Sequence, residues 1–495
     1  MYLIYELIDL YPPEFEPIFA PRLNRLFLFL REHPGLSEPE ACIQFLGDAE
    51  QGKYFNKMKT QLRAQLGHFL IAWPSSPDKR YKTVFYDCYK DFTVYKLFLL
   101  QSKRTLAIEI AKSLVPRLEK LEIHSLLYQV AQDLFMHHAV ITGSSRSMRK
   151  YERMAEKQLE IVRAESMVRL YYGRIGFICN TRDSFTPSVV REVQEAAEHV
   201  TPLLRLGSSQ LNRFIYSIIV TRYVVTYDNK NIVKYCNEAL NIIPDNHPNS
   251  RALRFSFMHK QVLSLLALGD SDKAKSIAKE ACEMVSIGGF NWHLAFIKRI
   301  IICFYREEYQ EAYELYKAHK QQKKVHDTAR EYWNIIHGYL HFLIQAEKIK
   351  PYTQERFNLG KFLNEVPVHS RDKAGQNINI LVIQILTRMQ RGEFGKIIDR
   401  IESLNAYART YTKTPATKRA NLFINMIVKM EAAHFHRSAT ELKTKILYRK
   451  LQETPVKFGQ NLAVEIIPYT VLWEEILLML RDQTRARTVR KTTIG

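Results

Sequence analysis

The fold is decided by residues 255–285, which read FSFMHKQVLSLLALGDSDKAKSIAKEACEMV. Three apolar residues in the first half recur at the spacing of one helix face: Met258, Val262 and Leu265. Leu268-Gly269-Asp270 then supplies a turn signal. Three alanines in the second half keep the helical period: Ala274, Ala278 and Ala281. The stretch predicts two amphipathic helices that pack as a hairpin, with small side chains where they meet.

Three further stretches repeat this pattern, at residues 227–248, 290–321 and 377–408. Steps of 42, 38 and 85 residues separate one inward position of the four copies: Ile232, Ala274, Ala312 and Ile397. The last step covers two repeats, so we expect the intervening second helix within residues 351–367. Looser pairs are expected at residues 89–114, 125–161, 167–206 and 208–243. Helix pairs at a fixed spacing predict an α-solenoid, in which each pair stacks on its neighbours.

Seven residues of these copies lie close to the relative spacings of a known repeat family: Gly269, Ala274, Ala281, Ala312, Tyr316, Ala239 and Pro244. On these residues the chain resembles a divergent tetratricopeptide-repeat (TPR) protein. The resemblance implies a right-handed solenoid whose surface holds a protein or peptide. The family's tryptophan and leucine-glycine pair are missing from every copy, and the repeat is near 40 residues rather than about 34. The family's peptide-binding residues therefore cannot be transferred to this chain.

The N-terminal segment differs from the repeats because it predicts three short helices. The first has one apolar face, made of Leu23, Leu26, Phe27 and Leu30. Ser37 and Glu40 form a capping box that begins a second helix, which ends near Gly47. The third covers residues 51–73, and its apolar face is made of Phe55, Met58, Leu62, Leu66 and Phe69.

Four basic residues lie in the first half of this third helix: Lys53, Lys57, Lys59 and Arg63. Three helices in this order resemble a helix-turn-helix or winged-helix domain, whose final helix would lie in a DNA groove. Such a domain ahead of TPR-like repeats resembles a class of bacterial regulators. The alternative is a solenoid cap or a protein-docking module, since the terminal repeats of a solenoid need a polar outer face.

The chain of 495 residues carries a net charge of +21, and the excess of basic residues is largest towards the C-terminus. Residues 481–495 form a basic tail that includes Arg485, Arg487, Arg490 and Lys491. Such a tail can contact phosphate or an acidic partner. The alternative is a solvated, frayed terminus.

The six cysteines lie far apart and form no CxxC pair, so we expect a reducing compartment and a cytoplasmic protein. The first residues have no basic stretch ahead of an apolar one, and no signal peptide is predicted. No apolar window reaches the ~20 residues of a membrane span. We therefore expect no membrane partner.

No motif predicts catalysis, a cofactor or a metal site. The sequence lacks a GxxxxGK[ST] loop, an HExxH pair and a GxSxG elbow. His434 and His436 are two residues apart on a predicted helix, so they point to different faces and cannot chelate one metal. The adjacent His137 and His138 meet the same objection. We therefore expect a protein without enzyme activity, cofactor or metal.

Residues 146–174 hold the densest mixture of aromatic and basic residues, which can form a stacking platform for single-stranded nucleic acid. The favoured alternative is a solvated helix face that carries i, i+3 ion pairs. The three pairs expected on that face are Arg149 with Glu152, Arg153 with Glu156, and Lys157 with Glu160.

The sequence thus predicts an all-α protein with a small helical domain at residues 1–80, a TPR-like right-handed α-solenoid at 81–480 and the basic tail at 481–495. The predicted function is a non-enzymatic adaptor or regulatory scaffold that binds a protein or peptide partner. The alternative is a nucleic-acid-binding transcriptional regulator with a TPR-like sensor or oligomerisation region. Partner identity and oligomeric state stay open at this point.

Overall fold

The computed structural model describes residues 1–8, 11, 19–72, 80–181, 185–243, 250–320, 327–352, 357–365, 376–411, 417–458 and 465–480. The elements in these ranges are helices, and no β-strand is present among them. The prediction of an all-α protein is confirmed for this part of the chain. Contacts divide the chain into unit 1, Met1–Glu152, and unit 2, Arg153–Gly495.

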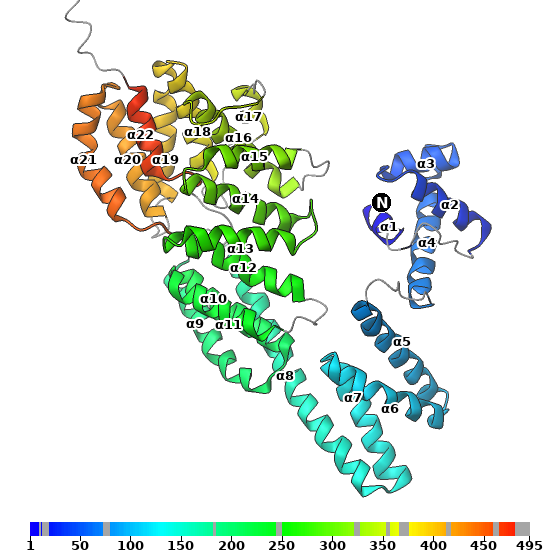
Figure 1. The fold of residues 1–495 in the computed structure, drawn as a ribbon. Helices are drawn as coiled ribbons and strands as arrows, with labels where there is room; N and C mark the ends of the chain where they lie inside the picture. Colours follow the sequence, from blue (N-terminus) through cyan, green and yellow to red (C-terminus); the bar gives the residue numbers. More distant parts are fainter. Residues whose placement is uncertain are drawn as a thin grey trace, which may run out of the picture. The chain divides into compact units, whose positions relative to one another are not determined.

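The first helices of unit 1 enclose a core of their own. They are α1 (Tyr2–Ile8), α2 (Pro21–Glu32), α3 (Glu38–Leu46), the 3-10 helix η1 (Ala49–Gln51) and α4 (Gly52–Ala72) (Figure 1). The predicted inward positions of α2 and α4 are buried together: Leu23, Leu26, Phe27, Leu30, Phe55, Met58, Leu62 and Leu66. The side chain of Phe69 lies outside the described residues.

The predicted ends of α3 are also present. The Ser37 N–H donates to the Glu40 carboxylate over 2.9 Å, as a capping box requires. Gly47 follows the helix with a φ of 81°, a conformation that glycine adopts without a steric penalty. Local sequence signals therefore decide where this helix begins and ends.

The rest of unit 1 continues as consecutive packed helices. These are α5 (Arg80–Leu100), α6 (Arg104–Lys120), α7 (His124–Met136), the π-helix η3 (His137–Thr142) and the start of α8 (Ser145–Thr181). Asp133 of α7 accepts hydrogen bonds from Tyr95 and Lys96 of α5, which joins the first helix of this group to the third. The domain boundary at residue 80 stays a prediction.

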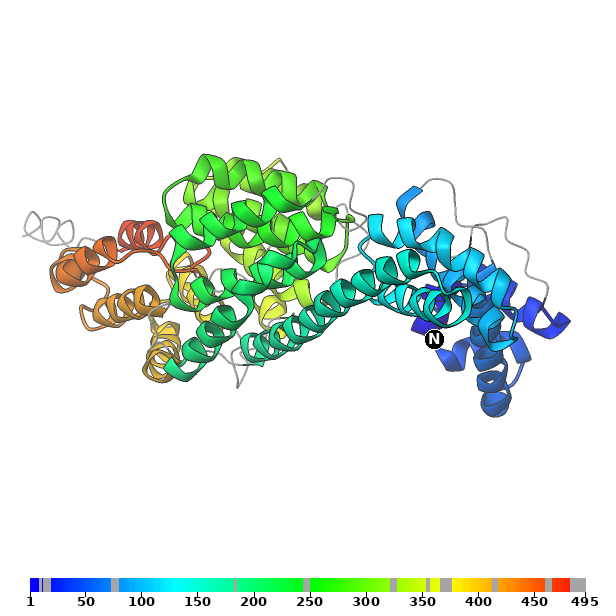
Figure 2. The ribbon, with the colours of Figure 1, turned by 90° about the horizontal axis from the view of Figure 1, so that it is seen from below.

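Helix α8 differs from the sequence-based expectation. Separate helices were expected before Ile161 and after Met167, but one helix runs without a break from Ser145 to Thr181 (Figure 2). This stretch contains no proline, so nothing in it removes a hydrogen bond from the helix ladder. The division between units 1 and 2 falls inside this helix.

Unit 2 is a series of helices that pack on their neighbours in chain order (Figure 1). After α8 come α9 (Pro187–Val200), η4 (Thr201–Leu206), α10 (Ser209–Thr226), α11 (Asn229–Ile242), α12 (Ser250–Ala267), α13 (Ser271–Glu283), α14 (Phe290–Tyr305), α15 (Tyr309–Lys320) and α16 (Asp327–Gln345). The remainder are α17 (Leu359–Glu365), α18 (Gln376–Gln390), η5 (Phe394–Lys396), α19 (Ile398–Tyr411), α20 (Lys418–Glu431), α21 (Arg437–Glu453) and α22 (Tyr469–Met479). The predicted stacked hairpins are present, and α17 lies where the intervening helix was expected.

The hairpin of α12 and α13 follows the pattern read from residues 255–285. Gly269 forms the turn with a φ of 84°, and the Asp270 carboxylate accepts from the Lys273 N–H over 3.2 Å to cap α13. The side chains of Ala274 and Ala281 are at most 1% exposed. Alanine at these positions lets α13 approach its neighbours closely while still burying apolar surface.

The remaining repeat residues that the structure describes are buried as Ala274 and Ala281 are. Ala239 of α11 and Ala312 and Tyr316 of α15 are buried, whereas Pro244 lies outside the described residues. A further close contact, between α16 and α18, was not predicted from the sequence. A Cβ at Gly338 of α16 would lie 2.9 Å from side-chain atoms of Ile383 of α18, so only glycine fits there without a shift.

Among the described residues, none of the helices combines the length and the apolar character that crossing a bilayer would need.

Ala274→Glu tests the packing of the array. A carboxylate at this buried position would have no partner, so we expect the free energy of unfolding to fall by about 3 kcal/mol. Ser276→Glu on the exposed face of α13 is the control and should change it by less than about 0.5 kcal/mol. Chemical denaturation measures both, and equal effects would show that Ala274 is not at a close helix contact.

Candidate protein-binding surface

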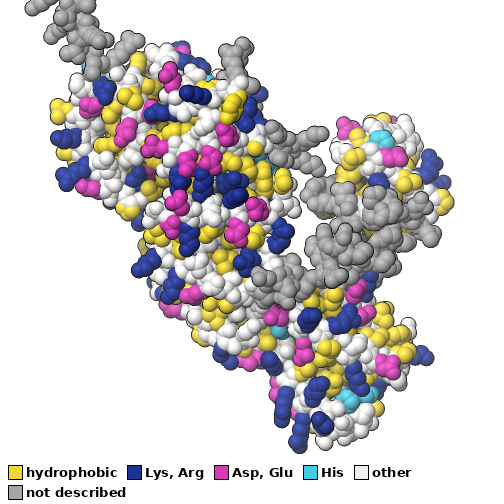
Figure 3. Space-filling view, in the orientation of Figure 1, with side chains coloured by type: hydrophobic (Ala, Val, Ile, Leu, Met, Phe, Trp, Pro, Cys, Tyr) yellow, Lys and Arg dark blue, Asp and Glu magenta, His cyan; other side chains and the backbone are white. Residues whose placement is uncertain are grey.

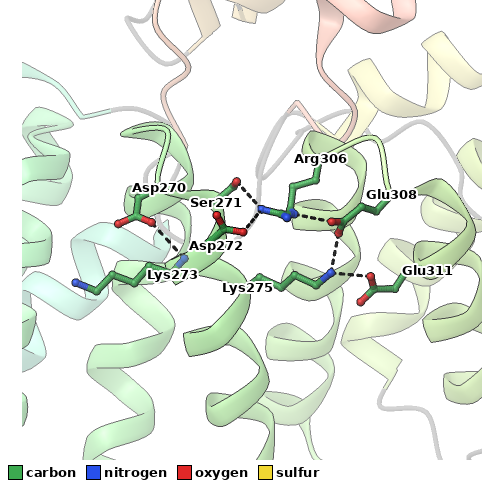
Figure 4. Close-up of polar contacts among 8 residues, drawn as sticks. All are labelled: Asp270, Ser271, Asp272, Lys273, Lys275, Arg306, Glu308 and Glu311. Carbon is green, nitrogen blue, oxygen red and sulfur yellow. Dashed lines mark hydrogen bonds and ion pairs between the residues drawn. The ribbon is translucent and has the colours of Figure 1, made fainter.

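A polar network joins two neighbouring hairpins of unit 2 at their turns (Figure 4). Arg306 follows α14, and its guanidinium donates to Asp272 over 2.7 Å, to Ser271 over 2.8 Å and to Glu308 over 2.8 Å. Asp272 and Ser271 begin α13, so one arginine connects the turn between α12 and α13 to the turn between α14 and α15. These ion pairs fix the relative position of the two turns.

Lys275 of α13 extends this network to α15. Its ammonium lies 2.7 Å from the Glu308 carboxylate and 2.6 Å from that of Glu311. Burial alone would lower the pKa of Lys275, but the hydrogen bonds to both carboxylates raise it overall. The two acids are therefore neutralised by a cation of the chain itself.

Cys303 lies beside these acids, and its sulfur and one oxygen of Glu308 and of Glu311 lie within 4.8 Å of one another. Such a group resembles a metal site in composition. Burial raises the pKa of the Cys303 thiol to about 12, and both neighbouring carboxylates already bind the Lys275 ammonium. With Lys275 bound to both carboxylates, the geometry is that of an ion-pair network.

The segment ahead of α22 is fastened to the array by a buried ion pair. Arg419 of α20 contacts both carboxylate oxygens of Glu465 over 2.8 Å, and these side chains are only 8% and 6% exposed. Arg419 also donates to the carbonyls of Leu451 and Thr454 over 2.6 Å. The Tyr469 N–H donates to Glu465 over 2.8 Å. Nearly every polar atom of the pair thus has a partner, which a buried pair needs in order to be stable.

Helix α22 and the residues just ahead of it are held by several other elements. The Tyr469 ring stacks on Phe423 of α20 with 4.5 Å between centroids. Glu474 accepts from the Tyr448 hydroxyl of α21 over 2.6 Å, and Lys348, after α16, lies 2.9 Å from Glu475. Tyr305 of α14 donates to the Glu465 carbonyl over 3.0 Å. Helix α22 and its leading segment are therefore bound by side chains of α14, α20 and α21 and by the residue that lies after α16.

A pocket of about 340 Å³ lies beside α22. It is lined by the end of α16, the end of α18 and the last turn of α22, including Phe342, Gln345, Gln390, Glu475, Leu478 and Met479. Gln390 donates to the Phe342 carbonyl over 2.9 Å, which fixes one wall. Leu478 is 61% exposed, so a large apolar side chain of the pocket lining faces solvent.

Lys298 of α14 is a buried cationic residue that sequence reasoning missed. Its side chain is 1% exposed, and its amine lies 2.9 Å from His259 Nε2 and 2.7 Å from the His259 carbonyl. Burial lowers the pKa of Lys298 to about 7. The sequence contained a signal for this burial, since Lys298 lies within the apolar run FIKRIII. A lysine on the solvated face of a helix rarely has so many apolar neighbours. It does not line the pocket beside α22.

A second missed cluster joins α14, α15 and α16. Trp333 donates to His293 over 3.3 Å, and the His319 ring stacks on Trp333 with 3.4 Å between centroids. Burial lowers the pKa of His319 to about 4, so this ring is neutral at pH 7. The cluster packs hairpins together, and the rings come from three helices whose contacts no local sequence pattern reveals.

The four basic residues predicted on α4 do not share one face. Lys57 and Lys59 are separated by about 200° around the helix axis, since each residue adds about 100°. Lys53 and Lys57 are exposed, whereas Lys59 is ion-paired with Glu38 of α3. Arg63 lines a pocket of about 380 Å³ with α1. The tail residues Arg485, Arg487, Arg490 and Lys491 lie outside the described residues.

The three ion pairs expected along the start of α8 are not formed in the described structure. Glu160 instead lies 2.7 Å from Arg205 of η4. Tyr151, which was considered as a stacking platform, is 7% exposed and packs against His138. His434 lies in the turn after α20 with a φ of 50°, so the expected helix around His434 and His436 is wrong.

Neither a scan against protein-family models nor a search of curated proteins found a match to this chain. The resemblance to TPR proteins therefore stays a prediction.

Glu465→Gln tests the buried ion pair. The substitution leaves the Arg419 charge buried without its counter-charge, so we expect the free energy of unfolding to fall by about 3 kcal/mol. Glu453→Gln breaks the exposed pair with Arg449 and should leave stability nearly unchanged. Denaturant titration distinguishes the two, and similar small effects would mean that the ion pair does not hold α22 in place.

Lys298→Met tests the buried lysine through pH. The pKa of Lys298 is about 7 in the folded chain against 10.5 for a solvated lysine, so between these values the unfolded state binds the extra proton. Wild-type stability should therefore rise with pH in this window, by up to about 1.4 kcal/mol per unit, relative to the variant. The variant's advantage is largest below pH 7. The exposed Lys445→Met controls for the loss of one charge, and parallel pH profiles of Lys298→Met and wild type would contradict the assignment.

Proposed function

We propose that this protein is a non-enzymatic adaptor that holds a protein or peptide partner on its stacked hairpins. The observation that carries the proposal is α22, a helix that is bound, together with the segment ahead of it, by side chains of α14, α20 and α21 and by Lys348. A surface that binds one apolar helix in this way has the chemistry to bind another. The adaptor is cytoplasmic, and its array is a right-handed TPR-like solenoid.

The partner contacts the pocket beside α22. The exposed Leu478 supplies apolar contact, while Gln345 and Gln390 supply hydrogen-bonding groups in the lining. A lining that combines an exposed apolar side chain with hydrogen-bonding groups is typical of surfaces that bind peptide segments. The network around Arg306 and Lys275 keeps the neighbouring turns rigid, so little conformational entropy is lost on binding.

Leu478→Glu tests this surface. A charge next to the pocket should abolish capture of a specific partner from a lysate of the native cell, because the apolar contact is replaced by an unpaired carboxylate. Leu442→Glu on α21 is the matched control, since Leu442 is 77% exposed and lies outside this pocket. Capture that survives Leu478→Glu, or that is lost equally in the control, would contradict the proposed surface.

A second candidate function is nucleic-acid binding by the N-terminal helices. The observation that favours it is the surface shared by α2 and α4, where Arg22 donates to the Tyr54 hydroxyl over 2.9 Å beside the exposed Lys53 and Lys57. Cations and an aromatic ring near the start of one helix are the groups that contact phosphates and bases.

Fluorescence anisotropy with duplex DNA, single-stranded DNA and RNA tests this candidate. Binding should fall steeply between about 50 and about 200 mM salt, because phosphate contacts release counterions. Lys53→Gln with Lys57→Gln should weaken it, whereas Lys59→Gln should have little effect because Lys59 already pairs with Glu38. Absence of binding at the lower salt would remove the candidate.

A further inference from the structure

One end of unit 1 combines exposed apolar side chains with unpaired positive charge. No acidic residue lies between Asp133 and Glu152, a stretch that contains the end of α7, all of η3 and the start of α8. We call Met136, Val140, Ile141, Arg146 and Arg149 the basic-apolar tip. In Figure 3 this end of unit 1, at the bottom of the view, carries many Lys and Arg side chains with His among them.

The apolar part of the tip is contiguous and faces solvent. Met136, Val140 and Ile141 are 51%, 68% and 53% exposed, and the last two lie side by side on η3. Large aliphatic side chains in such a group are costly to leave in water, and their presence marks an interaction site. A π-helix is a rare element that is frequently found at functional sites.

The backbone of η3 is fixed by contacts of His138 on the buried side of the tip. The His138 ring stacks on Tyr151 of α8 with 5.6 Å between centroids and 3° between planes. His138 Nδ1 lies 2.9 Å from the Thr142 hydroxyl at the other end of η3. These buried contacts fix the backbone that presents Val140 and Ile141, so the apolar side chains are not a product of a loosely packed turn.

The positive charge comes from arginine and lysine. Arg146 and Arg149 are exposed, and neither forms an ion pair with any described residue. Burial, followed by the charges of Lys112 and Arg104, lowers the pKa of His137, which places these two cations of α6 near η3. Both histidines of η3 have lowered pKa values, so the charge of the tip does not depend on them at neutral pH.

We propose that the basic-apolar tip binds the surface of a membrane that contains anionic lipids. Exposed aliphatic side chains at the connection between two helices can insert among acyl chains while the surrounding cations meet the lipid phosphates. A nucleic acid would use the cations but would gain nothing from valine and isoleucine, which cannot stack on bases. The sequence predicts no membrane partner because it contains no spanning segment, and peripheral binding, which needs none, departs from that prediction. This proposal does not depend on the adaptor function.

Co-sedimentation of the full-length protein with lipid vesicles tests the proposal. Vesicles of phosphatidylcholine with phosphatidylserine should bind the protein, and vesicles of phosphatidylcholine alone should bind it much less. Arg146→Gln with Arg149→Gln should weaken binding roughly 30-fold, since each cation near an anionic surface contributes about one kcal/mol. Val140→Ser with Ile141→Ser should weaken it at least about tenfold.

Matched controls come from α21. Leu442→Ser with Ile446→Ser removes two aliphatic side chains that are 77% and 71% exposed, and Lys445→Gln with Lys450→Gln removes two exposed charges. Both control variants should bind vesicles as wild type does, and circular dichroism should show that all variants are folded. No sedimentation with anionic vesicles, or equal losses in the controls, would overturn the proposal. Loss with the arginine variant alone, together with equal binding of duplex DNA, would overturn it in favour of a general polyanion site.

Discussion

The fold of unit 2 depends on the burial of one apolar face that no single hairpin can cover by itself. Close approach between successive helices makes this burial efficient, and it requires small side chains at the contacts. Ala274 and Ala312 are fully buried at such contacts, and Gly338 leaves room for Ile383 of the next long helix. Because neighbouring hairpins bury each other's apolar faces, the stability of the array is shared along its length.

Helices α18, α20 and α21 present an apolar surface in the last described part of the array. Helix α22 covers part of this surface, and Arg419 and Glu465 fasten the segment that leads to it. The ion pair is far less exposed than that of Arg449 and Glu453, so its charges interact through a medium of low dielectric constant. The same burial makes it costly to remove one partner alone.

Charge is organised locally, although the chain as a whole carries +21. Around Lys275 and Arg306 the cations are matched by Asp272, Glu308 and Glu311, and the network joins hairpins (Figure 4). At the basic-apolar tip the cations have no such matches among the described residues, and the surface is left to attract an anionic partner. Net charge alone therefore does not identify a binding surface. Cations that have no acidic partner within the chain are the better indicator.

The sequence by itself determined the helices, the turn at Gly269, the capping box of α3 and the small buried side chains, because these follow from local periodicity and backbone preference. Only the tertiary structure decided which charges are paired. Lys59 contacts Glu38, Glu160 contacts Arg205, and Arg419 contacts Glu465, and in each case the partner is distant along the chain. The position of α22 likewise depends on packing between helices. Local patterns specify the elements, but contacts between residues far apart in sequence decide which surfaces stay exposed.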